Sequence, residues 1–127
     1  MPLVRHNISS GYPYENTYGY SRAVRVGDQV FVSGTTARST ALAENAYVQA
    51  TAALGIVADA LADAGASLGH VVRTVVYIVD MKDAPQIARA HREHFGTIRP
   101  ASTLVQVVAL TPPEAHVEFE VTAIVSN

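Results

Sequence analysis

Two glutamates near the C-terminal end of the chain are the residues with the clearest potential for chemistry. Glu118 and Glu120 stand in the run from Val117 to Val125, in which every odd-numbered residue is apolar. This alternation predicts a strand, and its period of two places both carboxylates on one face, about 7 Å apart. On a half-buried sheet such carboxylates either form structural ion pairs or line a pocket, where a glutamate can transfer protons.

Two histidines offer a weaker candidate for a metal site. His91 and His94 are spaced i, i+3 in a predicted helix, which is compatible with metal binding, but no third ligand is evident. We interpret the pair as part of a solvated helix face. The sequence also lacks a phosphate-binding loop, a dinucleotide fingerprint and a nucleophile elbow. It therefore predicts no metal and no cofactor.

The composition narrows the class of protein and of partner. The chain has 127 residues and a net charge of −2, so no basic field indicates a nucleic acid or an anionic membrane as partner. It has no cysteine, which excludes thiolate catalysis, disulfides and cysteine-held zinc. No stretch is apolar over the length that a bilayer requires. We expect a cytoplasmic protein with a single domain over residues 1–127.

The secondary structure follows from hydrophobic periodicity and turn residues. Apolar residues at steps of three and four, many of them alanines, predict a helix that approaches the sheet closely. The elements expected in chain order are an N-terminal arm or loop over residues 1–18, a hairpin of strands Tyr20–Val26 and Gln29–Ser33, a helix over about Ala46–Ala64, a strand Val71–Val79, a helix from Asp83 to about Phe95, and two strands within Arg99–Val107 and Val117–Val125.

This β-β-α-β-α-β-β order predicts an α+β fold with a mixed sheet and both helices on one face. The face that carries Glu118 and Glu120 is then left without a helical cover. A sheet of this size with one bare face is usually covered by oligomerisation or exposed to water.

Five short motifs, in this order and at these spacings, resemble the RidA/YjgF family, and the resemblance extends from Gly19 to Ile124. They are Gly19-Tyr20-Ser21-Arg22-Ala23-Val24, Val32-Ser33-Gly34, Asp80-Met81-Lys82-Asp83, Pro100-Ala101 and Val117-Glu118-Phe119-Glu120. The resemblance implies a chorismate-mutase-like fold and a homotrimer whose three sheets form a central barrel. It also implies intersubunit clefts that bind small molecules, and the hydrolysis of enamines and imines to keto acids and ammonia.

The resemblance assigns site residues only in part. Glu118 matches the glutamate that holds or activates the hydrolytic water, and Tyr20 matches the tyrosine of the family's Gly-Pro-Tyr-Ser motif. These two are the candidate catalytic residues. Ser33 matches the serine of the family's Ser-Gly-Gln, in which Thr35 replaces the glutamine, and both are candidate ligand-binding residues.

Three further candidate ligand-binding positions differ from the deaminases of the family. Ser102 stands where those enzymes have an arginine that binds the substrate carboxylate, Ala88 where asparagine is usual, and His91 where tyrosine is common. Replacing a guanidinium by one hydroxyl removes about 2–4 kcal/mol of substrate positioning. We therefore expect ordinary 2-imino acids to be poor substrates.

Another arginine could replace the missing one. Arg22 is the first candidate, because it lies two residues after Tyr20 and would share its strand face. Arg38, in the polar loop after Ser33, is the second. The alternative for each is a surface or interface arginine. Arg73 is interpreted as the ion-pair partner of Glu120.

Three classes of function remain open on the sequence. The first is a hydrolase for an enamine, an imine or a related labile compound, in which Glu118 orients water. The second is a trimeric binding protein without catalysis. The third, nucleic-acid cleavage, is disfavoured by the acidic balance. For the first two we expect Glu118 close to Ser102 on a neighbouring strand, in a site that suits a neutral or cationic ligand, and we interpret Tyr12, Tyr14 and Tyr18 as packing and interface residues.

Overall fold

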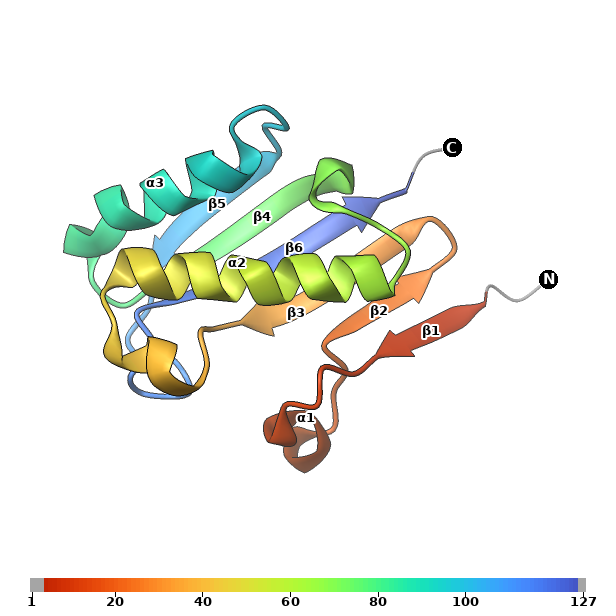
Figure 1. The fold of residues 1–127 in the computed structure, drawn as a ribbon, viewed down its shortest axis with the longest axis horizontal. Coiled ribbons are helices and arrows are strands. Elements are labelled where there is room, and N and C mark those ends of the chain that lie inside the picture. Colours follow the sequence, from red (N-terminus) through yellow and green to blue (C-terminus); the bar gives the residue numbers. More distant parts are fainter. Residues whose placement is uncertain (1–3, 126–127) are drawn as a thin grey trace.

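A six-stranded mixed sheet forms the centre of the computed structural model, which describes residues 4–125 (Figure 1). Only β4 and β5 run parallel; the other neighbouring strands are antiparallel. The strands lie side by side in the order β1 (Arg5–Ile8), β2 (Ala23–Val26), β3 (Gln29–Thr35), β6 (Val117–Ile124), β4 (Val71–Ile78) and β5 (Ala101–Gln106).

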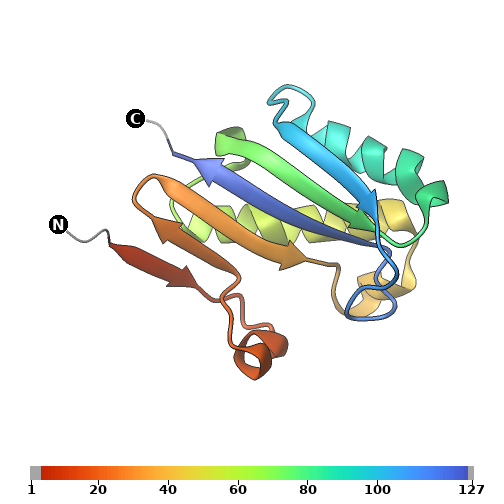
Figure 2. The same ribbon diagram turned by 180° about the vertical axis from the view of Figure 1, so that it is seen from behind.

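Two helices cover one face of this sheet and leave the other face bare. Helix α2 (Ala46–Asp63) crosses the middle strands and α3 (Ala84–Phe95) lies over β4 and β5, whereas the reverse view looks directly onto the strands (Figures 1 and 2). Short 3₁₀ turns at Ser39–Ala43, Leu68–His70 and Met81–Asp83 connect the elements. The predicted α+β fold with both helices on one face is confirmed.

The hydrophobic core lies between the helices and the sheet. The predicted stripe of α2 is buried, and its alanines bring the helix backbone close to the strands. Asn45 caps the start of α2 by accepting a hydrogen bond from the backbone of Val48 at 2.9 Å. The helix is followed by Gly65, whose φ of 79° is one that glycine adopts without strain.

Strand β6 alternates as its sequence predicts. Val117, Phe119, Val121 and Ala123 are at most 1% exposed and belong to the core under the helices. The residues between them point to the bare face, and among these Glu118 is half-buried. The strand therefore directs its carboxylates away from the core.

The segment expected as an arm or loop forms two elements within its described part, residues 4–18. Strand β1 pairs with β2, and α1 (Pro13–Tyr18) lies in the connection between them, beyond the ends of both strands (Figure 1). Neither has a clear pattern, because β1 is mostly exposed and α1 has only six residues. Proline at the start of α1 and Gly19, with a φ of 92°, at its end are its local signals.

Two expectations about the strands are wrong in detail. The last two strands are not neighbours, because β4 lies between β5 and β6. The first hairpin strand begins at Ala23 rather than Tyr20. In addition, the register between β3 and β6 shifts between Val32 and Thr35, so that Ser33 and Gly34 form an irregularity in β3.

Candidate functional site

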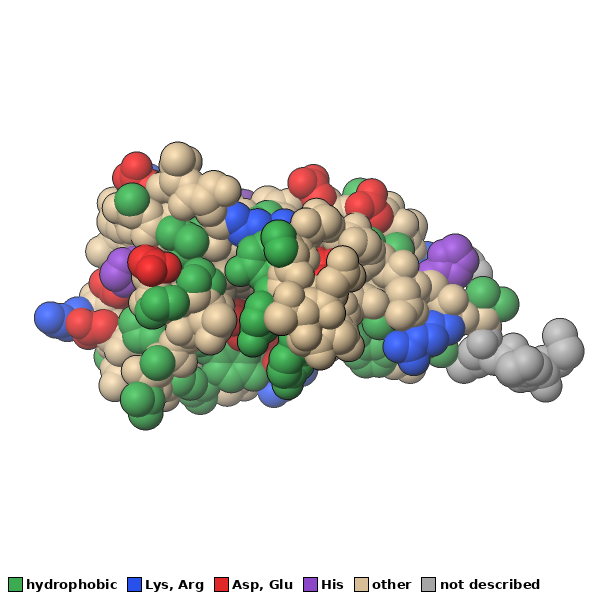
Figure 3. Space-filling model, turned by 90° about the horizontal axis from the view of Figure 1, so that it is seen from below, with side chains coloured by type: hydrophobic (Ala, Val, Ile, Leu, Met, Phe, Trp, Pro, Cys, Tyr) green, Lys and Arg blue, Asp and Glu red, His purple; other side chains and the backbone are tan. Residues whose placement is uncertain are grey.

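A cavity of about 510 Å³ lies on the bare side of the sheet, where α1, β3 and β6 meet. Figure 3 views the molecule from the α1 side and shows hydrophobic, basic and acidic side chains mixed around a recess. The lining residues used below are Tyr12, Tyr14, Tyr18, Tyr20, Arg22, Phe31, Ser33, Gly34, Arg38, Glu118 and Glu120.

Glu118 lies directly over the irregular part of β3. A Cβ atom at Gly34 would overlap Oε1 of Glu118 and stand 2.7 Å from its Cδ atom, which is far closer than such atoms approach one another. The absence of a side chain at Gly34 therefore creates the space that the carboxylate occupies. The sequence Ser33-Gly34 and Glu118 are thus parts of one arrangement, although they are distant in the chain.

The environment of Glu118 favours its protonated form. Burial raises the pKa of Glu118 above its ordinary value; the positive charge of Arg22 opposes this rise, and the negative charge of Glu120 adds to it. Glu118 takes part in none of the ion pairs formed among residues 4–125. It is a half-buried carboxyl group at a cavity, with a pKa displaced toward neutrality, as a group that transfers protons requires.

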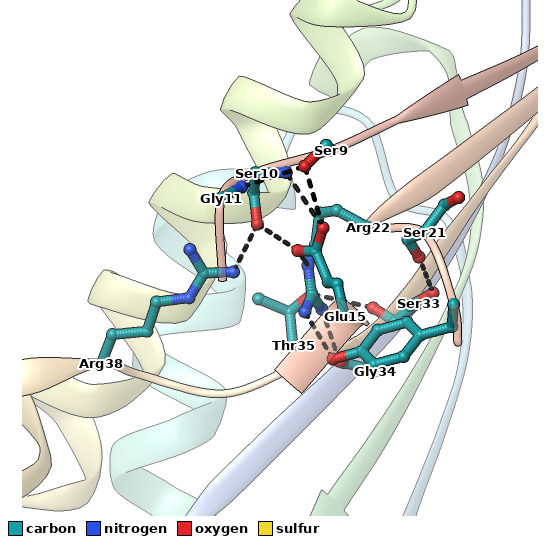
Figure 4. Close-up of polar contacts among 11 residues, drawn as sticks. Ser9, Ser10, Gly11, Glu15, Ser21, Arg22, Ser33, Gly34, Thr35 and Arg38 are labelled. Atoms are coloured by element: carbon teal, nitrogen blue, oxygen red, sulfur yellow. Dashed lines mark hydrogen bonds and ion pairs between the residues drawn. The ribbon is translucent and has the colours of Figure 1, made fainter. Parts of the chain in front are cut away.

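Arg22 is almost fully buried, at 2% exposure, and its donors are occupied by the protein (Figure 4). Its Nε atom pairs with Glu15 at 3.3 Å, and its Nη2 atom donates to the Tyr20 hydroxyl at 2.9 Å. Its Nη1 atom donates to the Gly34 carbonyl at 2.8 Å and to Thr35 Oγ1 at 3.0 Å. Four of the five N–H groups are thereby used, which is typical of a structural arginine.

Glu15 of α1 supplies the counter-charge for Arg22. Burial alone raises the pKa of Glu15, but hydrogen bonds from the side chain and backbone of Ser10, together with Arg22, hold that pKa below its ordinary value. Ser9 Oγ also donates to the carboxylate, at 3.3 Å. The ionised pair fastens α1 and the turn before it to β3, and so fixes one wall of the cavity.

Arg38 is the arginine with donors left for a ligand. Its Nη2 atom donates to Ser10 Oγ at 2.8 Å, its only recorded hydrogen bond within residues 4–125, and its guanidinium lies 4.5 Å from the centre of the Tyr12 ring. Burial and repulsion from Arg22 lower its pKa, but an arginine remains charged at neutral pH. The order expected from the sequence, Arg22 before Arg38, is therefore reversed by the geometry.

Tyr20 and Ser33 lie at the same cavity as Glu118, as expected, whereas Thr35, a candidate ligand-binding residue, does not line it. Tyr20 and Ser33 line the cavity, and the hydroxyl of Tyr20, which accepts from Arg22, keeps its own proton for donation. Ser33 Oγ donates to the Ser21 carbonyl at 2.6 Å. Thr35 is buried and bonded to Arg22, so it supports the site and does not line the cavity.

Ser102 lies elsewhere within one chain, and the expectation that it is close to Glu118 is wrong. It is paired across β4 with Thr74, whose buried hydroxyl donates to Ser102 Oγ at 2.7 Å and lies 2.9 Å from His91 Nε2. These groups belong to the helix-covered side of the sheet. Burial and the nearby His94 lower the pKa of His91. Ala88 is exposed on α3.

The predicted ion pair of Arg73 with Glu120 does not form. Glu120 accepts a hydrogen bond from the Tyr77 hydroxyl at 2.9 Å instead. Tyr77 stands opposite Glu118 and Arg73 opposite Thr122, so the arginine is two positions further along the strand than a pair with Glu120 requires. The hydrogen bond to Glu120 raises the pKa of Tyr77, and burial raises it further by a smaller amount.

Sequence reasoning missed Glu15 and Phe31, and it interpreted Tyr14 and Tyr18, which line the cavity, as packing and interface residues. The i, i+4 spacing of Tyr14 and Tyr18 indicates one helix face, but only if α1 is recognised. Within residues 4–125 no group of three or more His, Asp or Glu side chains is arranged to hold a metal ion. In the same part of the chain no helix has the length and apolar character needed to cross a membrane.

Comparison with known proteins supports the resemblance drawn from the motifs. The family model described as endoribonuclease L-PSP matches residues 13–125, almost the whole chain. The chain belongs to the RidA/YjgF family. Its similarity to the mouse 2-iminobutanoate/2-iminopropanoate deaminase is 32% identity over 109 residues, 83% of this chain and 80% of the mouse protein.

Solved structures of the RidA/YjgF family have the same fold. The Mycobacterium tuberculosis protein Rv2704, of the YjgF/YER057c/UK114 family, is 40% identical, with a TM-score of 0.90 over 96% of this chain and 100% of its own. RidA from a Psychrobacter species is 28% identical, with a TM-score of 0.76 over 84% of this chain and 88% of its own. The fold is therefore that of the RidA/YjgF proteins.

Proposed function

We propose that this RidA/YjgF protein hydrolyses a reactive imine or enamine in the cavity on the bare face, with Glu118 as the acid–base group. The observation that carries the proposal is the carboxyl group of Glu118, half-buried over Gly34, outside the ion pairs of residues 4–125 and with a raised pKa. The carboxylate of Glu15, which is buried and structural, has partners that lower its pKa instead.

The reaction needs four proton transfers, and one carboxyl group can perform them in turn. Protonated Glu118 donates its proton to the imine nitrogen, which makes the imine carbon more electrophilic. The resulting carboxylate takes a proton from water as the water oxygen adds to that carbon. Glu118 then passes this proton to the amine nitrogen, which leaves as ammonia, and the carboxylate takes the hydroxyl proton as the carbonyl forms. Imine and water thus give carbonyl compound and ammonia, and Glu118 ends protonated as it began.

Arg38, which lines the same cavity as Glu118, supports the binding of a substrate with an acidic group. Of the two arginines that line the cavity, it is the one with donors left over, and it is held by Ser10 and the Tyr12 ring rather than by a carboxylate. Ser102, by contrast, lies outside the cavity of its own chain. For this reason we expect slow turnover of 2-iminopropionate and dependence of any turnover on Arg38.

We further infer that a homotrimer completes the site with residues of a second copy. All six residues of the edge strand β5 are exposed, and Leu104 and Val105 among them are apolar. An exposed edge strand with apolar side chains is normally covered in soluble proteins. Ser102 belongs to this strand, so a trimer that covers β5 would bring it to the cavity of a neighbour.

The test is hydrolysis of imines formed in the assay by an amino-acid oxidase, with spontaneous hydrolysis as baseline. Wild-type protein should accelerate the formation of keto acid, and Glu118→Gln should reduce the acceleration by about 10²-fold or more, since general acid–base catalysis contributes that much. Glu93→Gln, which changes an exposed carboxylate on α3 outside the cavity, is the matched control and should retain full activity.

Two outcomes would contradict the proposal. Equal rates for wild type and Glu118→Gln would remove Glu118 from the reaction. The absence of acceleration for every imine, combined with ligand binding in the same cavity, would favour the alternative of a binding protein without catalysis.

A further inference from the structure

The aromatic residues of the chain are concentrated at the cavity rather than in the core. The chain has six tyrosines and three phenylalanines, and five of these nine side chains line the cavity, namely Tyr12, Tyr14, Tyr18, Tyr20 and Phe31. The core is built from alanine, valine, leucine and isoleucine, with Phe95 and Phe119 as its only aromatic members among residues 4–125. Burying aromatic area stabilises a fold strongly, so its placement around a surface cavity calls for an explanation.

Three of the tyrosines form a continuous wall. The rings of Tyr14 and Tyr18 are stacked with centroids 5.8 Å apart, and both meet the Tyr20 ring nearly at right angles, at 6.5 and 5.8 Å. The spacing i, i+4 on α1 places the first two rings together, and Gly19 turns the chain so that Tyr20 joins them. Ion pairing of Glu15 with Arg22 holds α1, and with it the wall, in place.

Only part of this aromatic surface is used by the protein itself. The guanidinium of Arg22 lies over the Tyr12 and Tyr20 rings at 5.7 and 5.3 Å. Tyr18 is 74% exposed, Phe31 45% and Tyr14 42%. Within one chain, the last three rings therefore leave apolar area uncovered at the cavity.

The cavity of a single chain has more volume than a three-carbon imino acid needs. At about 510 Å³ it falls within the range of roughly 300–1,000 Å³ found for sites that enclose considerably larger organic ligands. The ionisable groups Glu118 and Arg38 border the same space. Such groups are depleted at the centres of protein–protein interfaces, which favours a small molecule over a second copy of the chain as the occupant of the cavity.

We propose that the substrate of this site carries an aromatic ring, which packs against Tyr14, Tyr18 and Phe31 while the reacting carbon lies at Glu118. This preference for an aromatic substrate rests on the proposed function as far as hydrolysis is concerned. The preferred binding of an aromatic ligand does not depend on that reaction. The three rings are then specificity-determining residues, and an aromatic imino acid is preferred over an aliphatic one of the same reactive group.

The kinetic test compares the imines formed in the assay from phenylalanine and from alanine. We expect the wild type to accelerate hydrolysis of the phenylalanine-derived imine more, and Tyr18→Ala to reduce this preference about tenfold, because losing a packed ring contact reduces discrimination by that order. Tyr18→Phe should keep the preference. Tyr47→Ala on α2, whose ring contacts Arg89 and Glu93, is the matched control and should also keep it.

The binding test separates this inference from the proposed function. Calorimetry with phenylpyruvate and pyruvate, the corresponding products, should show tighter binding of phenylpyruvate and about tenfold weakening by Tyr18→Ala. If neither imine is hydrolysed but this binding pattern is found, the inference stands and the proposed reaction fails. Equal binding of both acids, or no effect of Tyr18→Ala, overturns the inference. A fall in particle mass of Tyr18→Ala in light scattering also overturns it, since the ring would then belong to a subunit interface.

Discussion

At the scale of single residues, Glu118 should make the stability of the protein depend on pH. Because its pKa is higher in the folded chain than in the unfolded chain, ionisation of Glu118 destabilises the fold. The stability it contributes is present below the unfolded pKa and is lost as the pH rises through the raised folded pKa. Glu118→Gln should therefore unfold at a higher temperature than the wild type at pH 7–8, and the difference should disappear near pH 4.

Calorimetric melting curves over this pH range check the prediction for Glu118. Glu44→Gln serves as the control, since Glu44 is exposed before α2 and takes part in none of the ion pairs of residues 4–125. A Glu118→Gln variant that melts below the wild type at pH 8 would mean that the ionised carboxylate stabilises the fold, and Glu118 would then be architectural.

The buried pair of Glu15 with Arg22 should respond in the opposite way. Glu15→Gln leaves the Arg22 charge buried without its partner, and we expect a loss of about 3–5 kcal/mol in the free energy of unfolding at neutral pH. Since the pKa of Glu15 is lowered in the folded chain, its contribution is present above the unfolded pKa and is lost as the pH falls through the lowered value. Denaturant titrations should show the difference shrinking in acid; a loss below 1 kcal/mol at pH 7 would contradict a structural role.

The location of a site residue could be predicted from the sequence where a motif defined it, but not where it depended on tertiary contacts. Tyr20, Ser33 and Glu118 meet at the cavity as the motifs predicted. The role of Arg22 could not be predicted, because its partner Glu15 belongs to a short helix that leaves no clear pattern. Ser102 was misplaced because the intervening position of β4 is a property of the sheet order and not of either strand.

At the scale of elements, glycine has different roles in β3, where Gly34 makes room for Glu118, and in α2, where Gly55 lies on the exposed side of the helix. Gly34→Ala places a methyl group against the Glu118 carboxylate, whose flexible end can move aside, so we expect little loss of stability and a displaced catalytic group. Gly55→Ala, in the exposed middle of α2 with open space around it, should stabilise the protein by about 1 kcal/mol.

Thermal unfolding and the imine hydrolysis assay on both glycine variants give the measurement. Gly34→Ala should lose activity while melting near the wild type, and Gly55→Ala should melt higher with unchanged activity. Full activity of Gly34→Ala would indicate that the position of Glu118 over the β3 backbone is not needed.

The long elements were predicted well because packing gives them a period. The helices α2 and α3 and the strands β3, β4 and β6 all bury one stripe or face, which the sequence records. Strand β1 and helix α1 were missed for the same physical reason. They bury little apolar area of their own, and their pairing with β2 and with Arg22 is decided by tertiary contacts.

At the scale of the whole molecule, the exposed apolar residues of β5 and the bare sheet face predict a homotrimer. Light scattering at micromolar concentration should give about three times the chain mass of 13.5 kDa. Val105→Asp, which places a charge on the exposed edge strand, should reduce the mass toward that of one chain without unfolding the sheet. A wild-type monomer at this concentration would contradict the assembly and the contribution of Ser102 to a neighbour.

The residues proposed to contact the substrate ring lie largely in the connection between β1 and β2, which is separate from the hydrophobic core. Residues 9–22 supply the tyrosine wall and Arg22, whereas the core is made of α2, α3 and the inner strands. Changes in this segment that keep Glu15 and Arg22 should leave the core intact. The selectivity of the protein can therefore be redesigned by exchanging residues in this segment. Glu118 and β3, which carry the proposed reaction, would stay unchanged.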